Sequence, residues 1–158
     1  MSKRSDTRRW LDKHRNDPYV RAAQKDNYRS RAVYKLAEVD ERDQLLKSKQ
    51  CIVDLGAAPG GWSQYCRRQR PQARVVALDR LDMKPIDGVD FLNVDFAEQA
   101  GVDTLMETLG SDRVDLVLSD MAPNLTGIMV ADQAGVMQLA ELALDLCASV
   151  LDADGDLF

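Results

Sequence analysis

A glycine-rich segment carries the clearest chemical signal in this sequence. Residues 54–62 read DLGAAPGGW and continue an apolar run, residues 51–55, that is typical of a buried strand. Glycines such as Gly56 and Gly60 let a backbone approach a nucleotide closely, so these two residues and Asp54 are candidates for cofactor binding. Pro59 lacks the amide hydrogen that would help to bind a pyrophosphate, which disfavours a phosphate-binding loop. The alternative is a tight turn that serves packing only.

Three further aspartates follow predicted strands. Asp79 lies 25 residues after Asp54, where a carboxylate can accept both ribose hydroxyls of an adenosine. Asp95 could accept a hydrogen bond from an adenine amino group, or it could cap a helix. Asp120, in the segment SDMAPN, could orient a lysine or an attacking hydroxyl, or it could cap a turn. Ligands bind at the carboxyl ends of parallel strands, so we expect these carboxylates to surround one pocket.

The charge of this predicted pocket separates two classes of enzyme. S-adenosylmethionine carries a sulfonium cation and no phosphate, whereas NAD carries two phosphates. No Lys or Arg occurs between residues 51 and 66, and aspartates are expected around the pocket. A negative pocket favours the cationic ligand. The pattern therefore predicts an S-adenosylmethionine-dependent methyltransferase, with a nicotinamide oxidoreductase as the rival interpretation.

Alternating strands and helices are expected to position these residues. Apolar runs predict strands at residues 51–55, 74–79, 89–94 and 114–120, and apolar periodicity predicts helices at residues 30–46, 62–69, 104–109 and 132–151. This order indicates an α/β fold with a doubly wound parallel sheet. Lys35 lies off the apolar stripe of its helix and is free to point toward a cleft or into solvent. Residues 151–158 are typical of a helix end, a turn and the start of a fifth strand, so we expect a fragment of a longer protein.

Composition limits the cellular context. The 158 residues contain no apolar run of the roughly 18 residues that a membrane span needs, and no secretory signal precedes the first strand. The spacing of Cys51, Cys66 and Cys147 fits neither a metal site nor a disulfide framework. We expect three reduced, buried thiols in a cytoplasmic, monomeric protein that has no metal and no membrane partner.

The charge distribution suggests a nucleic-acid partner. Net charge is -5, but residues 1–35 hold eleven Lys or Arg against four Asp or Glu. Aromatic side chains are interleaved with these cations, which suits RNA better than it suits a solvated tail, the alternative explanation. We predict a basic RNA-contacting arm at residues 1–29 and a methyltransferase domain at residues 30–158. The candidate RNA-binding residues are Arg8, Arg9, Arg29, Arg31 and Lys35.

Four ordered motifs resemble one known family. They are YRSRAVYKL at residues 28–36, VDLGAAPGGWSQY at 53–65, GVDFL at 88–92 and SDMAPN at 119–124. Together they look like the FtsJ family of large-subunit ribosomal RNA methyltransferases, and the similarity extends from Trp10 onward. The resemblance implies a Rossmann-like class I fold, S-adenosylmethionine as cofactor, and methylation of a uridine 2'-oxygen in 23S rRNA of the large ribosomal subunit. It also implies cofactor contacts from Gly60, Trp62, Asp79, Asp95 and Asp120.

The same resemblance implies a Lys-Asp-Lys-Glu catalytic tetrad. Lys35 matches the first lysine and Asp120 matches the aspartate. The second lysine, the proposed proton acceptor, and the glutamate would follow Phe158. A ribose hydroxyl is a poor nucleophile until a base removes its proton. We therefore expect residues 1–158 to keep much of the cofactor site and to lack competent catalysis, with a non-catalytic module that binds cofactor or RNA as the alternative.

Overall fold

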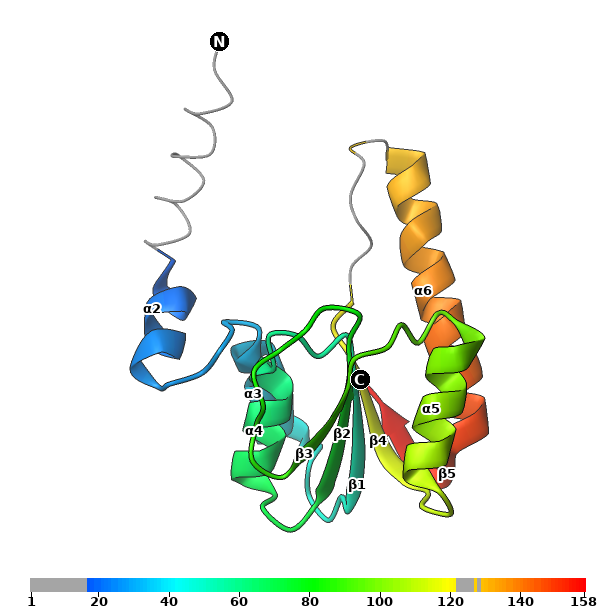
Figure 1. Ribbon diagram of the computed structural model, residues 1–158. Coiled ribbons are helices and arrows are strands. Elements are labelled where there is room, and N and C mark those ends of the chain that lie inside the picture. Colours follow the sequence, from blue (N-terminus) through cyan, green and yellow to red (C-terminus); the bar gives the residue numbers. More distant parts are fainter. Residues whose placement is uncertain (1–16, 122–126, 128) are drawn as a thin grey trace.

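Five parallel strands form the centre of the computed structural model, which describes residues 17–121, 127 and 129–158 (Figure 1). Their order in the sheet is β3-β2-β1-β4-β5. The strands are β1 (Cys51–Leu55), β2 (Arg74–Leu78), β3 (Val89–Leu92), β4 (Val114–Ser119) and β5 (Leu151–Leu157). The strand order reverses between β1 and β4, so the connections after these two strands leave in opposite directions and a crevice opens between them. The predicted doubly wound α/β fold is confirmed.

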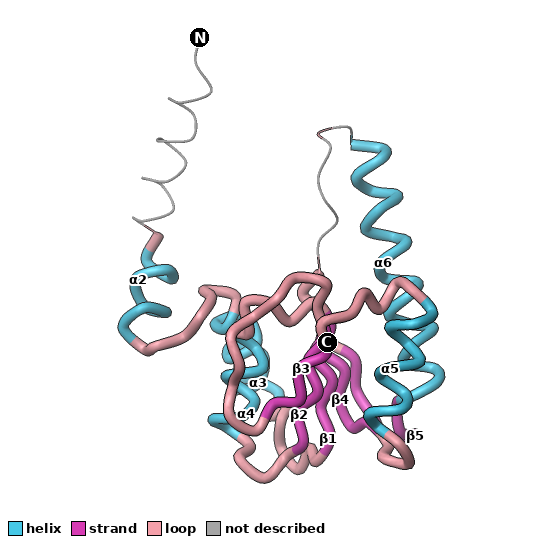
Figure 2. Tube along the Cα trace, viewed as in Figure 1, coloured by secondary structure: helices cyan, strands magenta, loops and turns pink. Residues whose placement is uncertain are grey.

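Helices cover both faces of the sheet (Figure 2). They are α3 (Val33–Asp43), α4 (Gly61–Gln69), α5 (Gln99–Leu109) and α6 (Met129–Val150), whereas α2 (Pro18–Lys25) lies to the side of the sheet (Figure 1). The buried side chains of α3 and α4 pack on one face, where Ile52 of β1 points, and those of α5 and α6 pack on the other, where Val53 and Leu55 point. Because both faces are covered, every residue of β1 is buried. Among the described residues, no helix combines the length and the apolar character that crossing a membrane requires.

The bounds of α3 and α6 differ from the prediction by three residues or fewer at each end, and two other helices differ in a more informative way. Helix α2 occupies part of the segment predicted as an arm, and it begins where Asp17 Oδ1 accepts a hydrogen bond from the Tyr19 amide at 2.8 Å, with Pro18 as its first residue. Helix α5 begins at Gln99, five residues before the predicted start at 104. Gly101 hides this start in the sequence, because glycine is a poor helix former. The helix nevertheless requires glycine at position 101, because a Cβ there would lie 2.0 Å from the Asp95 carbonyl oxygen.

The last strand also corrects the prediction. Helix α6 ends at Val150, and the strand runs from Leu151 to Leu157 where only its first residues were expected after a turn. Its register contains a shift, because Leu151 lies opposite Val114 while Asp156 lies opposite Leu116. Four residues of β5 thus face a single residue of β4. The turn expected in this glycine- and aspartate-rich stretch is present as this irregularity within the strand.

The three cysteines behave as predicted. Cys51, Cys66 and Cys147 are free and buried. Burial disfavours the thiolate and raises the pKa of all three thiols, that of Cys51 to about 11. These side chains therefore pack as small apolar groups in the core.

Candidate functional site

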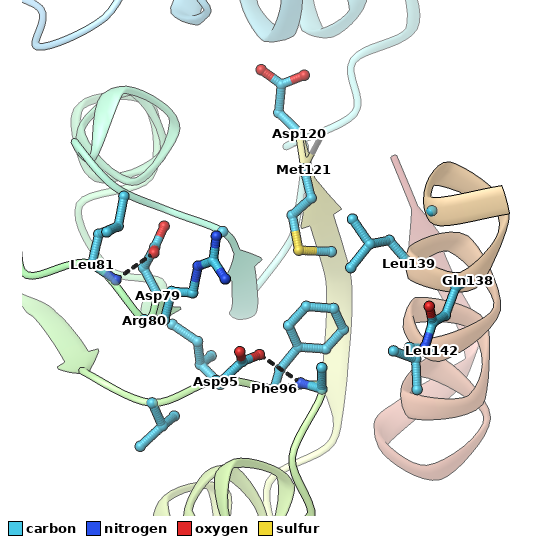
Figure 3. A pocket seen from close by; sticks show the side chains of 15 residues that line it. Asp79, Arg80, Leu81, Asp95, Phe96, Asp120, Met121, Gln138, Leu139 and Leu142 are labelled. Carbon is cyan, nitrogen blue, oxygen red and sulfur yellow. Dashed lines mark hydrogen bonds between the residues drawn. The ribbon is translucent and has the colours of Figure 1, made fainter. Parts of the chain in front are cut away.

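A cavity of about 500 Å³, called here the main pocket, lies at the carboxyl ends of the strands (Figure 3). The segments after β1, β2, β3 and β4 contribute to its lining, and α6 closes one side. This is the position expected from the reversal of strand order. The lining residues include Gly56, Asp79, Arg80, Leu81, Asp95, Phe96, Asp120, Met121, Gln138, Leu139 and Leu142.

Two carboxylates on the polar side of the main pocket are held by backbone amides. Asp79 Oδ2 accepts from the Ala58 amide at 2.9 Å, and Asp79 Oδ1 accepts from the Leu81 amide at 2.7 Å. Asp95 Oδ1 accepts from the Ala97 amide at 2.9 Å (Figure 3). The N-cap of α5 is Glu98, so Asp95 closes the turn before the helix and is not its N-cap. Each carboxylate oxygen has a second lone pair, so these oriented groups can still accept hydrogen bonds from a ligand.

Gly56 allows the loop after β1 to pass close to the segment after β4. Its φ angle is +71°, and a Cβ at this position would lie 2.4 Å from Cγ of Met121. Its amide donates to the Leu78 carbonyl at 2.9 Å, which joins this loop to the end of β2. Both the backbone conformation and the space therefore require glycine here, as the spacing of the motif indicated.

The opposite side of the main pocket is apolar. Met121 follows β4, Phe96 follows Asp95, and Leu139 and Leu142 project from α6 (Figure 3). An apolar wall facing a few oriented carboxylates suits a ligand with a flat ring and several hydroxyl or amino donors. No sequence motif marks these four residues as ligand-binding. The position of Phe96, directly after a candidate carboxylate, was the one local signal available.

Asp54 lies beneath the glycine-rich loop, outside the lining of the main pocket. Its side chain is buried and accepts a hydrogen bond from Ser63 Oγ at 2.6 Å. Burial raises the pKa of Asp54 to about 7, and the negative charges of Asp79 and Asp120 act in the same direction. Asp54 lines a smaller adjoining cavity of about 90 Å³ together with Asp120, which also lines the main pocket. The structure therefore gathers three of the four predicted aspartates around one pocket and places the fourth next to it.

Lys35 and Asp120 meet at the edge of the main pocket. Lys35 Nζ donates to Asp120 Oδ1 at 2.7 Å and lies 5.7 Å from the centre of the Trp62 ring. Val33 and Leu36 of α3 are fully buried, and this orients the intervening Lys35 toward solvent and the pocket. The side chains of Lys35 and Asp120 are 60% and 37% exposed. Figure 3 shows Asp120 at the end of the pocket away from Asp95. An incoming substrate can therefore reach the pair.

Gly60 and Trp62 lie on the other side of the loop from the main pocket. A Cβ at Gly60 would lie 2.8 Å from Cδ1 of Ile86, so this glycine faces the segment between β2 and β3. The Trp62 indole donates to the Ala32 carbonyl at 2.7 Å, and its ring stacks on Phe158 with centroids 5.4 Å apart. Trp62 lines the small cavity. Cofactor contacts by these two residues stay predictions.

The candidate RNA-binding residues have different surroundings. Arg8 and Arg9 lie outside the described residues, as do residues 122–124 of the motif SDMAPN. Arg31 forms an ion pair with Asp17. Arg29 donates to the carbonyl oxygens of Pro59, Lys84 and Pro85. Within residues 17–121, 127 and 129–158, no group of three or more His, Cys, Asp or Glu side chains is arranged to hold a metal ion.

Comparison with known proteins agrees with this geometry. The model of the FtsJ-like methyltransferase family matches residues 28–158. A protein of Marinobacter nauticus named ribosomal RNA large subunit methyltransferase E is 50% identical over 156 residues, which cover 98% of this chain and 75% of the relative. A protein of the same name from Stenotrophomonas maltophilia is 54% identical over 150 residues, which cover 94% of this chain and 71% of that one.

A solved structure shares the architecture. A protein from Plasmodium falciparum described as a ribosomal RNA methyltransferase superposes with a TM-score of 0.76 at 27% identity, over 82% of this chain and 76% of that chain. The family match covers the sheet, the main pocket and the Lys35–Asp120 pair. The protein belongs to the FtsJ-like methyltransferase family.

Proposed function

We propose that the protein transfers a methyl group from S-adenosylmethionine to the 2'-hydroxyl of a uridine ribose in 23S rRNA of the large ribosomal subunit. The observation that carries this proposal is the 2.7 Å pair of Lys35 and Asp120 at the edge of an acidic pocket. The names of the relatives from Marinobacter and Stenotrophomonas support ribosomal RNA as the substrate class.

The residues of the main pocket fit an adenosine that carries a cation. Asp79 is oriented to accept the ribose hydroxyls, and Asp95 is placed to accept from the adenine amino group. Phe96, Leu139 and Leu142 offer an apolar surface to the adenine ring. Asp120, which lines both cavities, contributes negative charge near the sulfonium. When bound, S-adenosylmethionine supplies an electrophilic methyl group.

The Lys35–Asp120 pair positions the acceptor. The Lys35 ammonium is held by the Asp120 carboxylate and keeps N–H donors for the oxygen atoms of an RNA ribose or phosphate. This contact aligns the 2'-oxygen with the methyl group, which lowers the entropic part of the barrier. The proton of the 2'-hydroxyl must pass to a base, and by the family resemblance that base is a second lysine expected after Phe158.

The test follows labelled methyl from S-adenosylmethionine into undermethylated large ribosomal subunits. It uses the 158-residue chain and a longer version that continues past Phe158 with the corresponding residues of the Marinobacter relative. Product RNA is treated with alkali, because a 2'-O-methyl blocks cleavage at the modified linkage. Transfer by the longer version, with an alkali-resistant dinucleotide, supports the proposal. Cofactor binding without transfer by either version would remove the rRNA assignment, and binding of NAD in place of S-adenosylmethionine would favour an oxidoreductase.

A further inference from the structure

We propose that Arg29 is a positioning residue of the cofactor pocket, and that it acts as a clamp between the loops after β1 and β2. The inference rests on the proposed binding of S-adenosylmethionine in the main pocket. It replaces the prediction that Arg29 contacts RNA phosphates. It also assigns a role in the pocket to the connection between α2 and α3, which does not line that pocket.

The guanidinium of Arg29 joins two loops that are distant in the sequence. Nη1 donates to the Pro59 carbonyl at 3.3 Å, in the loop after β1. The same nitrogen donates to the Lys84 carbonyl at 2.5 Å, and Nη2 donates to the Pro85 carbonyl at 2.7 Å, both in the segment between β2 and β3. These two loops provide Gly56 and Asp79 to the main pocket. A single cation thus adds to the links between these loops that the Gly56 and Ala57 amides form with the Leu78 carbonyl at 2.9 and 3.0 Å.

A second link between the same loops lies on the pocket side. It is the hydrogen bond from the Ala58 amide to Asp79 Oδ2. The Arg29 clamp lies on the outer side, where a Cβ on Gly60 would be 3.4 Å from Arg29 Nη1. Movement of the outer link would therefore change the distance between Ala58 and Asp79. This coupling connects Arg29 to the orientation of the carboxylate proposed to hold the ribose.

The backbone of Arg29 is itself held rigidly by α4. The Arg29 amide donates to Gln64 Oε1 at 3.1 Å, and Gln64 Nε2 donates to the Asn27 carbonyl at 2.7 Å. One turn later, Arg68 donates to the carbonyls of Asp26 and Asn27 at 2.9 and 3.0 Å. Helix α4 begins directly after the glycine-rich loop. A side chain that starts from a fixed backbone loses less entropy when it forms its hydrogen bonds, so the clamp is preorganised.

The surroundings of Arg29 favour a clamp over a phosphate contact. Both terminal nitrogens donate to carbonyl oxygens, and phosphate binding in the usual two-pronged geometry would require some of these bonds to break. Lys35, six residues later, instead reaches a carboxylate at the edge of the pocket. The two cations therefore have different roles. Arg29 shapes the cofactor pocket, and Lys35 faces the acceptor.

The experiment compares Arg29→Gln with Arg42→Gln in the 158-residue chain. Arg42 forms an exposed ion pair with Asp43 on α3, so Arg42→Gln removes the same charge away from the loops. Titration calorimetry measures the affinity for S-adenosylmethionine, and the salt dependence of binding to a 23S rRNA fragment measures phosphate contacts. We expect Arg29→Gln to weaken cofactor binding about 10-fold, since several hydrogen bonds that order the loops are lost, and to leave the salt dependence unchanged. Arg42→Gln should alter neither affinity.

Two further measurements distinguish positioning from general destabilisation. Hydrogen exchange at the Ala58 and Leu81 amides, which donate to Asp79, should accelerate in Arg29→Gln, while the Val53 amide in β1 stays protected. Millimolar guanidinium should restore part of the cofactor affinity of Arg29→Ala, and matched sodium chloride should not. If Arg29→Gln fails to fold, as loss of protection in β1 would show, the same criteria apply to Arg29→Lys, for which we expect a smaller loss of cofactor affinity.

The outcomes separate the clamp from the proposed function. Unchanged cofactor affinity in a folded Arg29 variant, with a wild-type chain that binds S-adenosylmethionine, would overturn the clamp and leave the function intact. A reduced salt dependence of RNA binding with unchanged cofactor affinity would assign Arg29 to phosphate contacts and overturn it too. A wild-type chain that binds no S-adenosylmethionine would instead remove the proposed function on which the clamp rests.

Discussion

The two ends of the sheet use aspartate differently. At the amino end, carboxylates form contacts within the fold: Asp115 accepts from the Gln50 and Cys51 amides at 2.7 and 2.8 Å, and other aspartates pair with cations of the same chain. Arg74 forms ion pairs with Asp90 at 3.3 Å and with Asp112 at 2.7 Å, and Lys49 forms one with Asp156 at 2.6 Å. These ion pairs connect neighbouring strands and loops, so their charges neutralise one another within the fold.

At the carboxyl end, carboxylates line the main pocket or lie next to it. Asp79 and Asp95 accept from backbone amides, and Asp54 accepts from Ser63 Oγ. In the described part of the chain, Asp120 alone among these four aspartates has an ion-pair partner, Lys35. The residue type alone therefore does not determine whether an aspartate stabilises the fold or serves a ligand. An aspartate away from the main pocket, such as Asp112 or Asp115, stabilises the fold through a cation or backbone amides, whereas an aspartate that lines the pocket can serve a cationic ligand.

Replacing the buried carboxyl group of Asp54 is expected to give the largest effect on stability. The folded state keeps a proton on Asp54 up to about pH 7, whereas the unfolded chain releases it near 3.8. Wild-type stability should therefore fall as pH rises between these values, by up to about 4 kcal/mol, and stay constant above them. Asp54→Asn lacks this titration. Urea unfolding of both proteins across this range measures the difference, and parallel pH curves would show that Asp54 is not held in its neutral form.

Lys35→Met tests the ion pair at the carboxyl end. In the longer version used for the transfer test, we expect methyl transfer to fall at least about 100-fold because the acceptor loses its positioning cation. Unfolding free energy should change by less than about 1 kcal/mol, since exposed ion pairs contribute little. Cofactor affinity should stay equal or rise slightly, because Asp120 loses its neutralising partner. Single-turnover transfer assays and calorimetry measure these quantities. Normal transfer by Lys35→Met would remove Lys35 from the proposed mechanism.

Asp79→Asn tests the amide-oriented carboxylates against the cation-paired ones. We expect about 30-fold weaker binding of S-adenosylmethionine, or about 2 kcal/mol, because a charged acceptor of two ribose hydroxyls is lost. The matched control is Asp112→Asn at the amino end, where the carboxylate pairs with Arg74 and lies outside the pocket lining. Calorimetry should show unchanged affinity for this control. If Asp79→Asn and Asp112→Asn lose the same amount of affinity for S-adenosylmethionine, the aspartates at the two ends of the sheet do not differ as proposed.

The carboxyl end could be predicted from the sequence because its signals are local. The run from Cys51 to Leu55 is apolar except for Asp54 because a parallel strand is buried on both faces, and the residue that follows such a strand must lie at its end. Lys35 could be placed near a cleft because it lies between the buried positions of α3. The structure adds what periodicity cannot supply, which is the distance of 2.7 Å to Asp120, 85 residues away.

Other contacts leave no periodic pattern. Arg29 binds three carbonyl oxygens, and any residue type offers a carbonyl, so no motif marks its partners. The apolar wall from α6 was hidden for a related reason, because a helix that covers a core and a helix that lines a pocket have the same apolar stripe. Helix α2 did have a signal, Asp17 followed by Pro18, but the basic charge of the segment favoured an arm.

Arg74→Met gives the smallest expected effect and sharpens the comparison from the amino end. The Arg74 side chain is 32% exposed, pairs with Asp90 and Asp112, and donates to the Thr108 carbonyl at 2.7 Å. Methionine keeps the apolar stem, so we expect the unfolding free energy to fall by only about 1 kcal/mol as these contacts are lost. Cofactor affinity should not change, because the network lies at the far end of the sheet from the main pocket. Urea unfolding and calorimetry measure the two quantities. If Arg74→Met folds normally but binds cofactor more weakly, charge at the amino end of the sheet also acts on the main pocket. The roles of the charged residues would then not be separated between the two ends of the sheet.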